Sequence, residues 1–223
     1  MSALTHRFEL LHNLAQAILE TPSPFVLRVA IDGVDGAGKT HFADELATVL
    51  EPSGRPIIRA SVDGFHHPRE RRYRLGRRSP EGFYRDSYDY AALKEHLLEP
   101  LSPGGSGRYR SAIYDVRAEE PVSVPPEQAE AGAILLFDGI FLHRSELQGY
   151  WNLSVWLEVP FSVSSPRGAA RGEGFGSPNP DAESNCRYVE GQRLYQLEAS
   201  PEHHATVVVN NVDLNAPFFV SGG

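Results

Sequence analysis

Residues 33–40 read GVDGAGKT, which matches the pattern G-x-x-x-x-G-K-[ST] of a phosphate-binding loop, or P-loop. Glycines let the backbone turn with its amides pointing inward, so that these amides and the N-terminus of the next helix surround phosphate oxygens. Lys39 would bring a positive charge to the β and γ phosphates, and the Thr40 hydroxyl can ligate Mg²⁺. A purely structural glycine turn is the alternative. The expected phosphate-binding residues are Gly33, Asp35, Gly36, Ala37, Gly38, Lys39, Thr40 and His41.

The flanking sequence supplies the strand and the helix that a P-loop requires. Residues 25–31 are largely apolar, which predicts a strand buried on both faces, as in a parallel sheet. Residues 39–50 predict a helix, because Phe42, Leu46 and Leu50 recur on one side. This strand–loop–helix context favours a functional nucleotide site over a chance match to the pattern.

Strands and helices alternate along the rest of the chain, which predicts an α/β fold. We expect a doubly wound, mainly parallel sheet flanked by helices, with the site at the carboxyl ends of the strands. The expected strands cover 57–62, 133–137, 153–159 and 206–210, with a short one at 109–114, and the expected helices cover 5–19, 90–98 and 188–198. Residues 69–88 give no clear pattern. The polar, glycine- and proline-rich stretch 164–185 predicts a mobile flap rather than core.

Composition places the chain among ordinary globular proteins. Its 223 residues are 41% hydrophobic and 22% charged, enough for one full core and a small appendage. We therefore expect a single P-loop domain over residues 1–223, with a lid at about 164–190. The net charge of −8 disfavours nucleic acid as a partner.

The sequence also predicts a cytoplasmic protein. Cys186 is the single cysteine, which excludes an internal disulfide and fits a reducing compartment. No apolar run approaches the roughly 20 residues that cross a bilayer, and residues 1–19 lack the apolar stretch of a signal peptide. We expect no membrane partner, and assembly into a homo-oligomer is left open.

Two aspartates follow predicted strands and are candidates for the chemistry. Asp138 follows four apolar residues, where P-loop enzymes place an acid that holds Mg²⁺ directly or through water. Asp63 follows the strand at 57–62, and a carboxylate there can accept a proton from an attacking hydroxyl and help orient the metal. A turn aspartate is the structural alternative for Asp138. His66 is a candidate substrate contact, with an exposed loop histidine as the alternative.

The order of the motifs resembles the uridine kinase-like family of P-loop kinases, within the phosphoribulokinase/uridine kinase superfamily. After the P-loop come VDGFHHPRE at 62–70, RSPEGFY at 78–84, YDV at 114–116, LLFDGIFL at 135–142 and RYVEGQRLY at 187–195. The resemblance spans about residues 15–217. It implies transfer of the γ-phosphoryl group of ATP, with Mg²⁺, to a hydroxyl of a small molecule.

The resemblance also implies roles for individual residues. Asp63 matches the catalytic base, Asp138 the second-strand acid and Tyr114 an aromatic substrate contact, while lid arginines reach the phosphates. Thr40, Asp63 and Asp138 are the expected metal site. The expected catalytic residues are Lys39, Asp63, Arg167 and Arg171. The expected substrate-binding residues are Asp63, Phe65, His66, Tyr84, Tyr114, Arg117, Arg187 and Gln192.

The chain departs from this family at several positions. Asp138 stands where well-studied uridine kinases carry glutamate, and Glu119 stands where they carry a histidine that reads the pyrimidine. Pro166 and Gly168 would weaken a lid helix. The expected acceptor is a nucleoside such as uridine, with pantothenate-like molecules and sugars or sugar phosphates as alternatives. A GTPase-type switch and a non-catalytic nucleotide-binding module are more remote alternatives.

A cluster of arginines follows Asp63. Its members are Arg69, Arg71, Arg72, Arg74, Arg77 and Arg78. A solvated basic face, a nucleic-acid contact and an anion site beside the acceptor pocket are the three alternatives. The anion site predicts an acceptor that carries its own negative charge.

Overall fold

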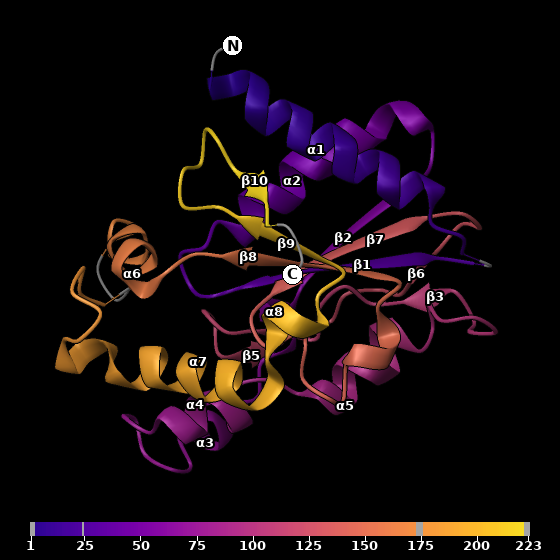
Figure 1. Ribbon diagram of the computed structural model, residues 1–223. Coiled ribbons are helices and arrows are strands. Elements are labelled where there is room, and N and C mark those ends of the chain that lie inside the picture. The colour runs from indigo at the N-terminus through magenta and orange to yellow at the C-terminus, as the bar shows by residue number, and fades with distance from the viewer. Residues whose placement is uncertain (1–2, 24, 173–175, 221–223) are drawn as a thin grey trace.

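A six-stranded sheet forms the centre of the molecule (Figure 1). The computed structural model describes residues 3–23, 25–172 and 176–220. The strand order is β10-β9-β8-β1-β7-β2, and all neighbours are parallel except the pair β9–β10. The strands are β1 (Leu27–Gly33), β2 (Ile57–Ser61), β7 (Ile134–Gly139), β8 (Leu153–Glu158), β9 (Val207–Asn210) and β10 (Phe218–Phe219).

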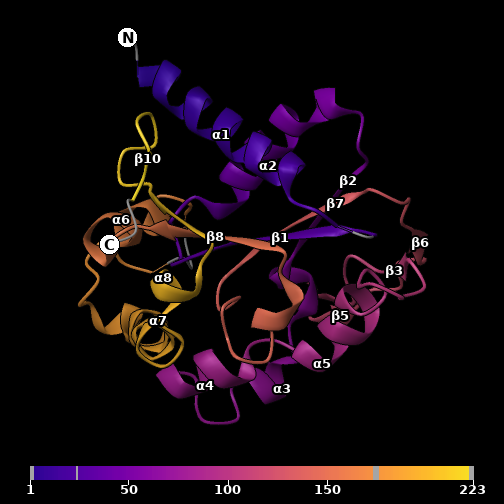
Figure 2. The same cartoon turned by 45° about the vertical axis from the view of Figure 1, so that its right-hand side comes forward.

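Helices cover both faces of this sheet, so the expected doubly wound α/β fold is confirmed. On one face lie α1 (Ala3–Glu20) and α2 (Lys39–Leu50), and most of the other helices lie on the opposite face (Figures 1 and 2). These are α3 (Arg69–Arg72), α4 (Pro80–Asp86), α5 (Tyr90–Leu93) with a π-helical turn at Lys94–Leu98, α7 (Cys186–Ala199) and α8 (Pro201–His204).

The central strands are apolar because both of their faces are covered. Every residue of β1 and β7 is buried, as expected for strands inside a parallel sheet. From β1 the chain continues to β2, at one edge of the sheet, whereas from β7 it continues to β8, on the other side of β1. The direction in which successive strands are added therefore reverses at β1, beside its carboxyl end. Open α/β sheets bind ligands at such a point.

Most expected elements occur close to their expected bounds, and the regions 69–88, 109–114 and 164–185 differ. Residues 69–88, for which the sequence gave no clear pattern, contain α3 and α4. Their many arginines and turn residues hide the apolar periodicity of a helix. The short strand expected at 109–114 is two separate strands, β3 (Arg108–Tyr109) and β4 (Tyr114–Asp115). They pair with β6 (Glu127–Gln128) and β5 (Glu120–Pro121) in two small antiparallel sheets.

The stretch expected to form a mobile flap contains a helix. Helix α6 (Phe161–Ala169) has Pro166 in its interior, so the weakening expected from this proline did not prevent the helix. Proline removes one N–H donor, but the turns on either side close normally, with Ser164 N bonded to the carbonyl of Pro160 at 3.0 Å. Asn185 organises the chain before α7, because its amide donates to the carbonyls of Ser177 and Asn179, each at 2.7 Å. Residues 173–175 of the predicted lid lie outside the described residues.

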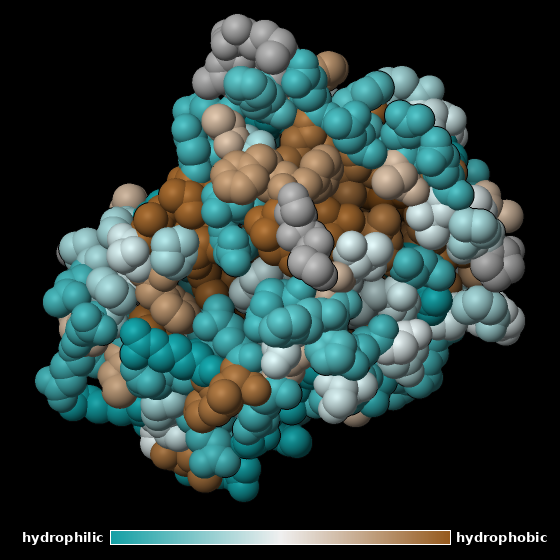
Figure 3. Space-filling model, viewed as in Figure 1, coloured by the Kyte–Doolittle hydropathy of each residue, from teal (hydrophilic) through white to brown (hydrophobic). Residues whose placement is uncertain are grey.

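The surface near α1 and the C-terminal strand is partly apolar (Figure 3). Phe8 on α1 and Phe218 on β10 are more than half exposed, and Phe219 is also exposed. The edge of the sheet at β10 is therefore only partly covered. Within the described part of the chain, no helix has both the length and the apolar character that would let it cross a bilayer.

Candidate active site

The P-loop connects the end of β1 to the start of α2. Gly36 and Gly38 adopt positive φ angles of 78° and 91°, a conformation that disfavours other residues. In the described part of the chain, the amides of Gly36, Gly38, Lys39 and Thr40 donate to no protein acceptor. Four unpaired donors at a helix N-terminus form a site for an anion such as phosphate.

Contacts from distant segments hold the loop in this shape. The Asn211 side chain donates to the carbonyl of Ala37 at 2.7 Å, and Gln192 Oε1 accepts the N–H of Asp35 at 2.6 Å. The Lys39 ammonium group donates to the carbonyl of Val34 at 2.9 Å, across the loop. The residue after β9, helix α7 and Lys39 thus hold the loop in place. The amides of Gly36, Gly38, Lys39 and Thr40 remain free to bind phosphate.

Below the loop, a buried aspartate joins several elements. Asp32 is fully buried and accepts hydrogen bonds from Gly33 N at 2.7 Å, Leu142 N at 2.9 Å and His143 Nδ1 at 2.8 Å. It also accepts from the Tyr195 hydroxyl of α7. These bonds compensate for burying a carboxylate and connect α7 to the base of the P-loop.

Thr40 and Asp138 provide oxygen donors of the kind that Mg²⁺ prefers. The Thr40 hydroxyl donates to Asp138 Oδ2 at 2.9 Å, and Asp138 Oδ1 accepts from Arg59 at 2.9 Å. No group of three or more ligating side chains occurs among the described residues. Two hard oxygen donors beside a phosphate site fit Mg²⁺, because this ion usually keeps several waters and takes further ligands from substrate phosphates.

Asp63 lies in the same pocket as the P-loop. It follows β2 in a 3-10 turn (Val62–Phe65), and its N–H donates to Ser61 Oγ. The Tyr88 hydroxyl donates to Asp63 Oδ1 at 3.3 Å. Burial and the neighbouring Asp63 raise the pKa of Tyr88 well above its usual value, so Tyr88 stays a donor to the carboxylate.

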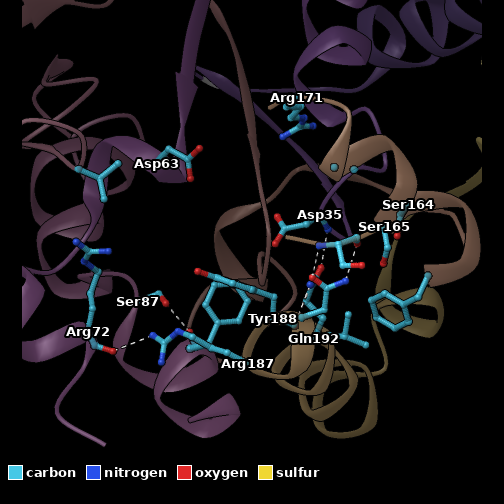
Figure 4. Close-up of a pocket in the computed structure, with 18 of the residues that line it drawn as sticks. Asp35, Asp63, Arg72, Ser87, Ser164, Ser165, Arg171, Arg187, Tyr188 and Gln192 are labelled. Atoms are coloured by element: carbon cyan, nitrogen blue, oxygen red, sulfur yellow. Dashed lines mark hydrogen bonds between the residues drawn. The ribbon is translucent and has the colours of Figure 1, made fainter. Parts of the chain in front are cut away.

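The pocket has a volume of about 400 Å³ and lies between the P-loop, the turn after β2, α6 and α7 (Figure 4). Asp35, Gly36, Asp63 and Arg171 all line it. Its walls also carry aromatic and polar side chains that suit a small polar molecule. These are His66, Arg72, Tyr73, Phe83, Ser87, Ser164, Ser165, Arg187, Tyr188 and Gln192.

Electrostatics distinguish two of the pocket residues. The Asp35 side chain opens into the pocket, and protein surrounds it on its other sides. Removal from bulk water raises the pKa of its carboxyl group; Lys39 opposes this effect and Asp63 adds to it. Burial lowers the pKa of His66, whose ring lies 4.5 Å from that of Tyr88. His66 is therefore favoured in its neutral form and can act as both donor and acceptor.

Several residues predicted to bind substrate lie elsewhere. Phe65 is fully buried and packs against Phe137, so it belongs to the core. Tyr84 is also buried, because α4 turns its ring toward Phe141 and Tyr195 of the core. The prediction that Phe65 and Tyr84 bind substrate is wrong. An aromatic residue within a polar motif can instead pack into the core and hold the motif in place.

Arg117, Tyr114 and His41 do not line the pocket either. Arg117 is exposed beyond β4, where its neighbour Val116 lines the pocket instead. Tyr114 is buried, and its hydroxyl donates to Glu119 at 3.1 Å. His41 lies on the exposed side of the first turn of α2.

The predicted lid arginines have separate surroundings. Arg171 lines the pocket, whereas Arg167 donates to the carbonyls of Asn211 at 3.1 Å and Val212 at 2.5 Å. The prediction that Arg167 and Arg171 act as a pair of phosphate clamps is therefore not supported for Arg167. The loop after β9, whose carbonyls need donors, holds this side chain.

Arg187 and Gln192 line the pocket, but their polar atoms bond to protein. Arg187 donates to the carbonyls of Arg72 at 2.9 Å and Ser79 at 3.0 Å, which fastens α7 to the turn before α4. Gln192 accepts from the P-loop amide and donates to Tyr188 O at 2.9 Å. Both side chains shape the pocket wall.

Half of the arginines in the cluster pair with acidic side chains in the described part of the chain. Arg74 pairs with Asp86 and Arg78 with Glu183, and Arg77 lies over the Tyr73 ring. Arg72 alone of the six lines the pocket described above. A collective anion site is thus not formed.

Tyr88 and Tyr188 are site residues that the sequence did not indicate. Tyr88 lies in the stretch 86–90, which reads DSYDY, and an aromatic and acidic repeat of this kind is the one signal that was available. Tyr188 lies within the motif RYVEGQRLY, in which only Arg187 and Gln192 were predicted to bind substrate. Their roles depend on contacts made across the pocket rather than along the chain.

Solved structures share this architecture. A possible uridine kinase from Bacillus stearothermophilus aligns with a TM-score of 0.72 and 20% identity, over 90% of this chain and 97% of that chain. A candidate fructose transport system kinase from Silicibacter sp. TM1040 aligns with a TM-score of 0.68 and 23% identity, over 84% of this chain and 94% of that chain. The fold is that of a P-loop kinase.

The alignment with a third structure covers both chains in full. The YGR205w protein aligns with a TM-score of 0.63 and 13% identity, over 100% of both chains. No protein-family model matches the chain. At these identities the likeness establishes the fold, and it agrees with the resemblance to the uridine kinase-like family that the motifs indicate.

Proposed function

We propose that this protein is an ATP-dependent kinase that transfers the γ-phosphoryl group to a hydroxyl of a small molecule. One observation carries the proposal: the P-loop residues Asp35 and Gly36 and the carboxylate of Asp63 line a single pocket. Phosphoryl transfer requires a phosphate site and a group that receives the hydroxyl proton on opposite sides of one small space. The P-loop kinase fold of the structural neighbours supports the same reaction class.

Each residue has a distinct role in this proposal. The free amides of the P-loop and Lys39 bind the phosphates of ATP, and Thr40 with Asp138 holds Mg²⁺, which neutralises phosphate charge. Asp63, oriented by the Tyr88 hydroxyl, positions the acceptor hydroxyl and takes its proton. Arg171 lies above the P-loop and stabilises charge on the transferred group. Helix α6 packs on Gly36, where a Cβ would meet the carbonyl of Ser164, and this contact excludes water from the site.

The acceptor that we propose is an uncharged polyol such as a nucleoside, uridine being the representative case. The pocket combines two carboxylates, which suit hydroxyl groups, with the aromatic rings of Tyr73 and Tyr188. Three of the six arginines in the cluster pair with acids and only Arg72 lines the pocket, so the cluster gives little support to an acidic acceptor such as pantothenate or a sugar phosphate. A structural neighbour is named as a possible uridine kinase and another as a candidate fructose transport system kinase, so a free sugar is the second candidate.

The test is a panel of acceptors incubated with ATP and Mg²⁺, scored by ADP formation above the rate without acceptor. We expect a neutral nucleoside or sugar to stimulate ADP formation, and Asp63→Asn to abolish this stimulation while binding of an ATP analogue persists. Asp89→Asn is a matched control on the same segment, since Asp89 caps α5 outside the pocket. Normal kcat in Asp63→Asn would remove Asp63 from the role of base. ATP binding without acceptor-dependent turnover by any compound would instead favour a non-catalytic module.

A further inference from the structure

An ion pair at the wall of the pocket has no part in the transfer reaction described above. Arg72, on α3, is only 9% exposed and pairs with Glu119, in the loop between β4 and β5. Its Nε donates to the carbonyl of His67 at 2.9 Å. The two contacts hold the guanidinium plane in one orientation at the edge of the pocket.

Glu119 is held in place in an unusual way. Its φ angle is 58°, in the left-handed region that residues with a side chain adopt only at a cost in free energy. Its second carboxylate oxygen accepts from the Tyr114 hydroxyl at 3.1 Å. Arg72 is the main cause that lowers the pKa of Glu119, so the carboxylate is charged at neutral pH. Glu119 does not itself line the pocket and reaches it only through Arg72.

One edge of the Arg72 guanidinium remains available. Nε and Nη2 are occupied by His67 and Glu119, whereas Nη1 donates to no acceptor in the described part of the chain. Arg72 lines the pocket together with Asp63 and His66. Among the described residues Nη1 is not one of the fully buried polar atoms that lack a partner, so water or a ligand in the pocket can reach this donor.

The charge of Arg72 is already neutralised by Glu119. An anionic acceptor would therefore gain little attraction from a pair that is neutral overall, and the other charged side chains of the pocket, Asp35, Asp63, Arg171 and Arg187, carry both signs. An uncharged carbonyl oxygen can accept the free Nη1–H bond without the cost of burying a further charge. The pair therefore favours an oxygen acceptor that carries no charge.

We propose that Arg72 determines acceptor specificity by donating from Nη1 to an uncharged carbonyl oxygen of the acceptor, and that Glu119 is the positioning residue that orients Arg72 and cancels its charge. This inference rests on the proposed kinase function and names the chemistry of its acceptor beyond the reacting hydroxyl. Arg72 binds substrate, and Glu119 and Tyr114 act through it.

The experiment compares three acceptors with wild type, Arg72→Lys and Glu119→Gln. Uridine carries uncharged carbonyl oxygens, ribose carries hydroxyls and no ring carbonyl, and pantothenate carries a carboxylate. Kinetic constants for each acceptor and for ATP are measured together with the melting temperature. Arg78→Ala is the matched control, because Arg78 belongs to the same arginine cluster and its partner Glu183 is exposed.

We expect wild type to use uridine best. Arg72→Lys should raise KM for uridine about 10- to 100-fold, with ribose and ATP constants nearly unchanged, because lysine keeps the charge and loses the forked geometry. Glu119→Gln keeps the shape of the side chain and leaves Arg72 unneutralised, so the ratio of kcat/KM for pantothenate to that for uridine should rise at least about tenfold. If Glu119 only supported the fold, Glu119→Gln would lower kcat/KM for both acceptors alike and leave the ratio of pantothenate to uridine unchanged.

Two results would overturn the inference while leaving the kinase function intact. One is a wild-type preference for pantothenate over both neutral acceptors. The other is a uridine-to-pantothenate ratio that does not change in Glu119→Gln, whatever becomes of Arg72→Lys. The proposed kinase function itself fails in a different way, if no compound in a broad panel stimulates ADP formation by the wild-type protein.

Discussion

The side-chain oxygen of Gln192 accepts the backbone N–H of Asp35 at 2.6 Å, which ties α7 directly to the P-loop. The same side chain donates to the carbonyl of Tyr188, so its orientation is fixed by its own helix. A helix more than 150 residues further along the chain thus sets the shape of the phosphate site. This connection predicts that α7 influences nucleotide binding without touching the nucleotide.

Gln192→Ala should weaken ATP binding. Without the acceptor, the amide of Asp35 is left unpaired and the loop loses a support, at a cost of about 1 kcal/mol or roughly a five- to tenfold rise in KM for ATP. KM for the acceptor should change little. Gln196→Ala, one turn further along α7, is the control because its side chain makes no hydrogen bond among the described residues. Steady-state kinetics at varied ATP check this, and an unchanged KM for ATP would show that the loop does not need this support.

Tyr195→Phe should destabilise the fold. The hydroxyl of Tyr195 donates to the fully buried carboxylate of Asp32, and its loss leaves that charge short of one donor. We expect the free energy of unfolding to fall by about 1–3 kcal/mol, as for other hydrogen bonds to buried charged groups. Denaturant titration measures this loss. Tyr150→Phe, whose hydroxyl bonds to Glu99 at the surface, should cost under about 1 kcal/mol, and an equal loss in both variants would contradict the argument.

The two lid arginines should behave differently on substitution. Arg171 lines the pocket, so Arg171→Ala should lower kcat at least about tenfold by removing positive charge near the transferred group. Arg167 supports the loop after β9 through two carbonyls, so Arg167→Ala should lower kcat much less and reduce thermal stability instead. Turnover assays and melting curves on both variants separate these effects. Equal losses of kcat in the two variants would show that Arg167 also acts in the reaction.

Stability should decline as pH falls below about 6.5. Burial lowers the pKa of His66 and of His67 from the usual value of 6.5. Between the folded and unfolded pKa values the unfolded chain binds more protons, so this part of the stability is complete above pH 6.5 and is lost as pH decreases. Asp63, Arg72 and Glu119 face His66 and modify its pKa to smaller extents.

Denaturant titrations at pH 7.5 and pH 5.5 check this pH dependence. His66→Gln should show a smaller loss of stability between the two conditions than wild type does. Asp35, whose pKa is raised by burial, is present in both proteins, and His66 is the smallest of the causes acting on that pKa, so Asp35 contributes nearly equally to both. His204→Gln alters an exposed histidine and should leave the wild-type difference unchanged. A His66→Gln variant with the full wild-type loss would show that His66 does not titrate in this range.

Local sequence was sufficient for the sheet and for the P-loop. The run of apolar residues in β1, followed by glycines and then by an amphipathic helix, can satisfy its backbone and bury its side chains in essentially one way. The positions of Asp63 and Asp138 at strand ends followed from the same pattern. Parallel strands bring their carboxyl ends to one edge, so Asp138 was expected near the P-loop, and its hydrogen bond with Thr40 agrees with this.

The composition of the pocket wall needed the tertiary structure. Phe65 and Tyr84 have the residue types of substrate contacts, yet the faces that α4 and the turn after β2 present to the core bury them. Arg72 and Arg78 look alike in the sequence, but only the packing of α3 brings Arg72 to the site and pairs it with Glu119. Periodicity determines which elements form, because it depends on neighbours along the chain. Which side chain enters a pocket depends on how separate elements pack, and this information is spread over residues that meet only in the folded molecule.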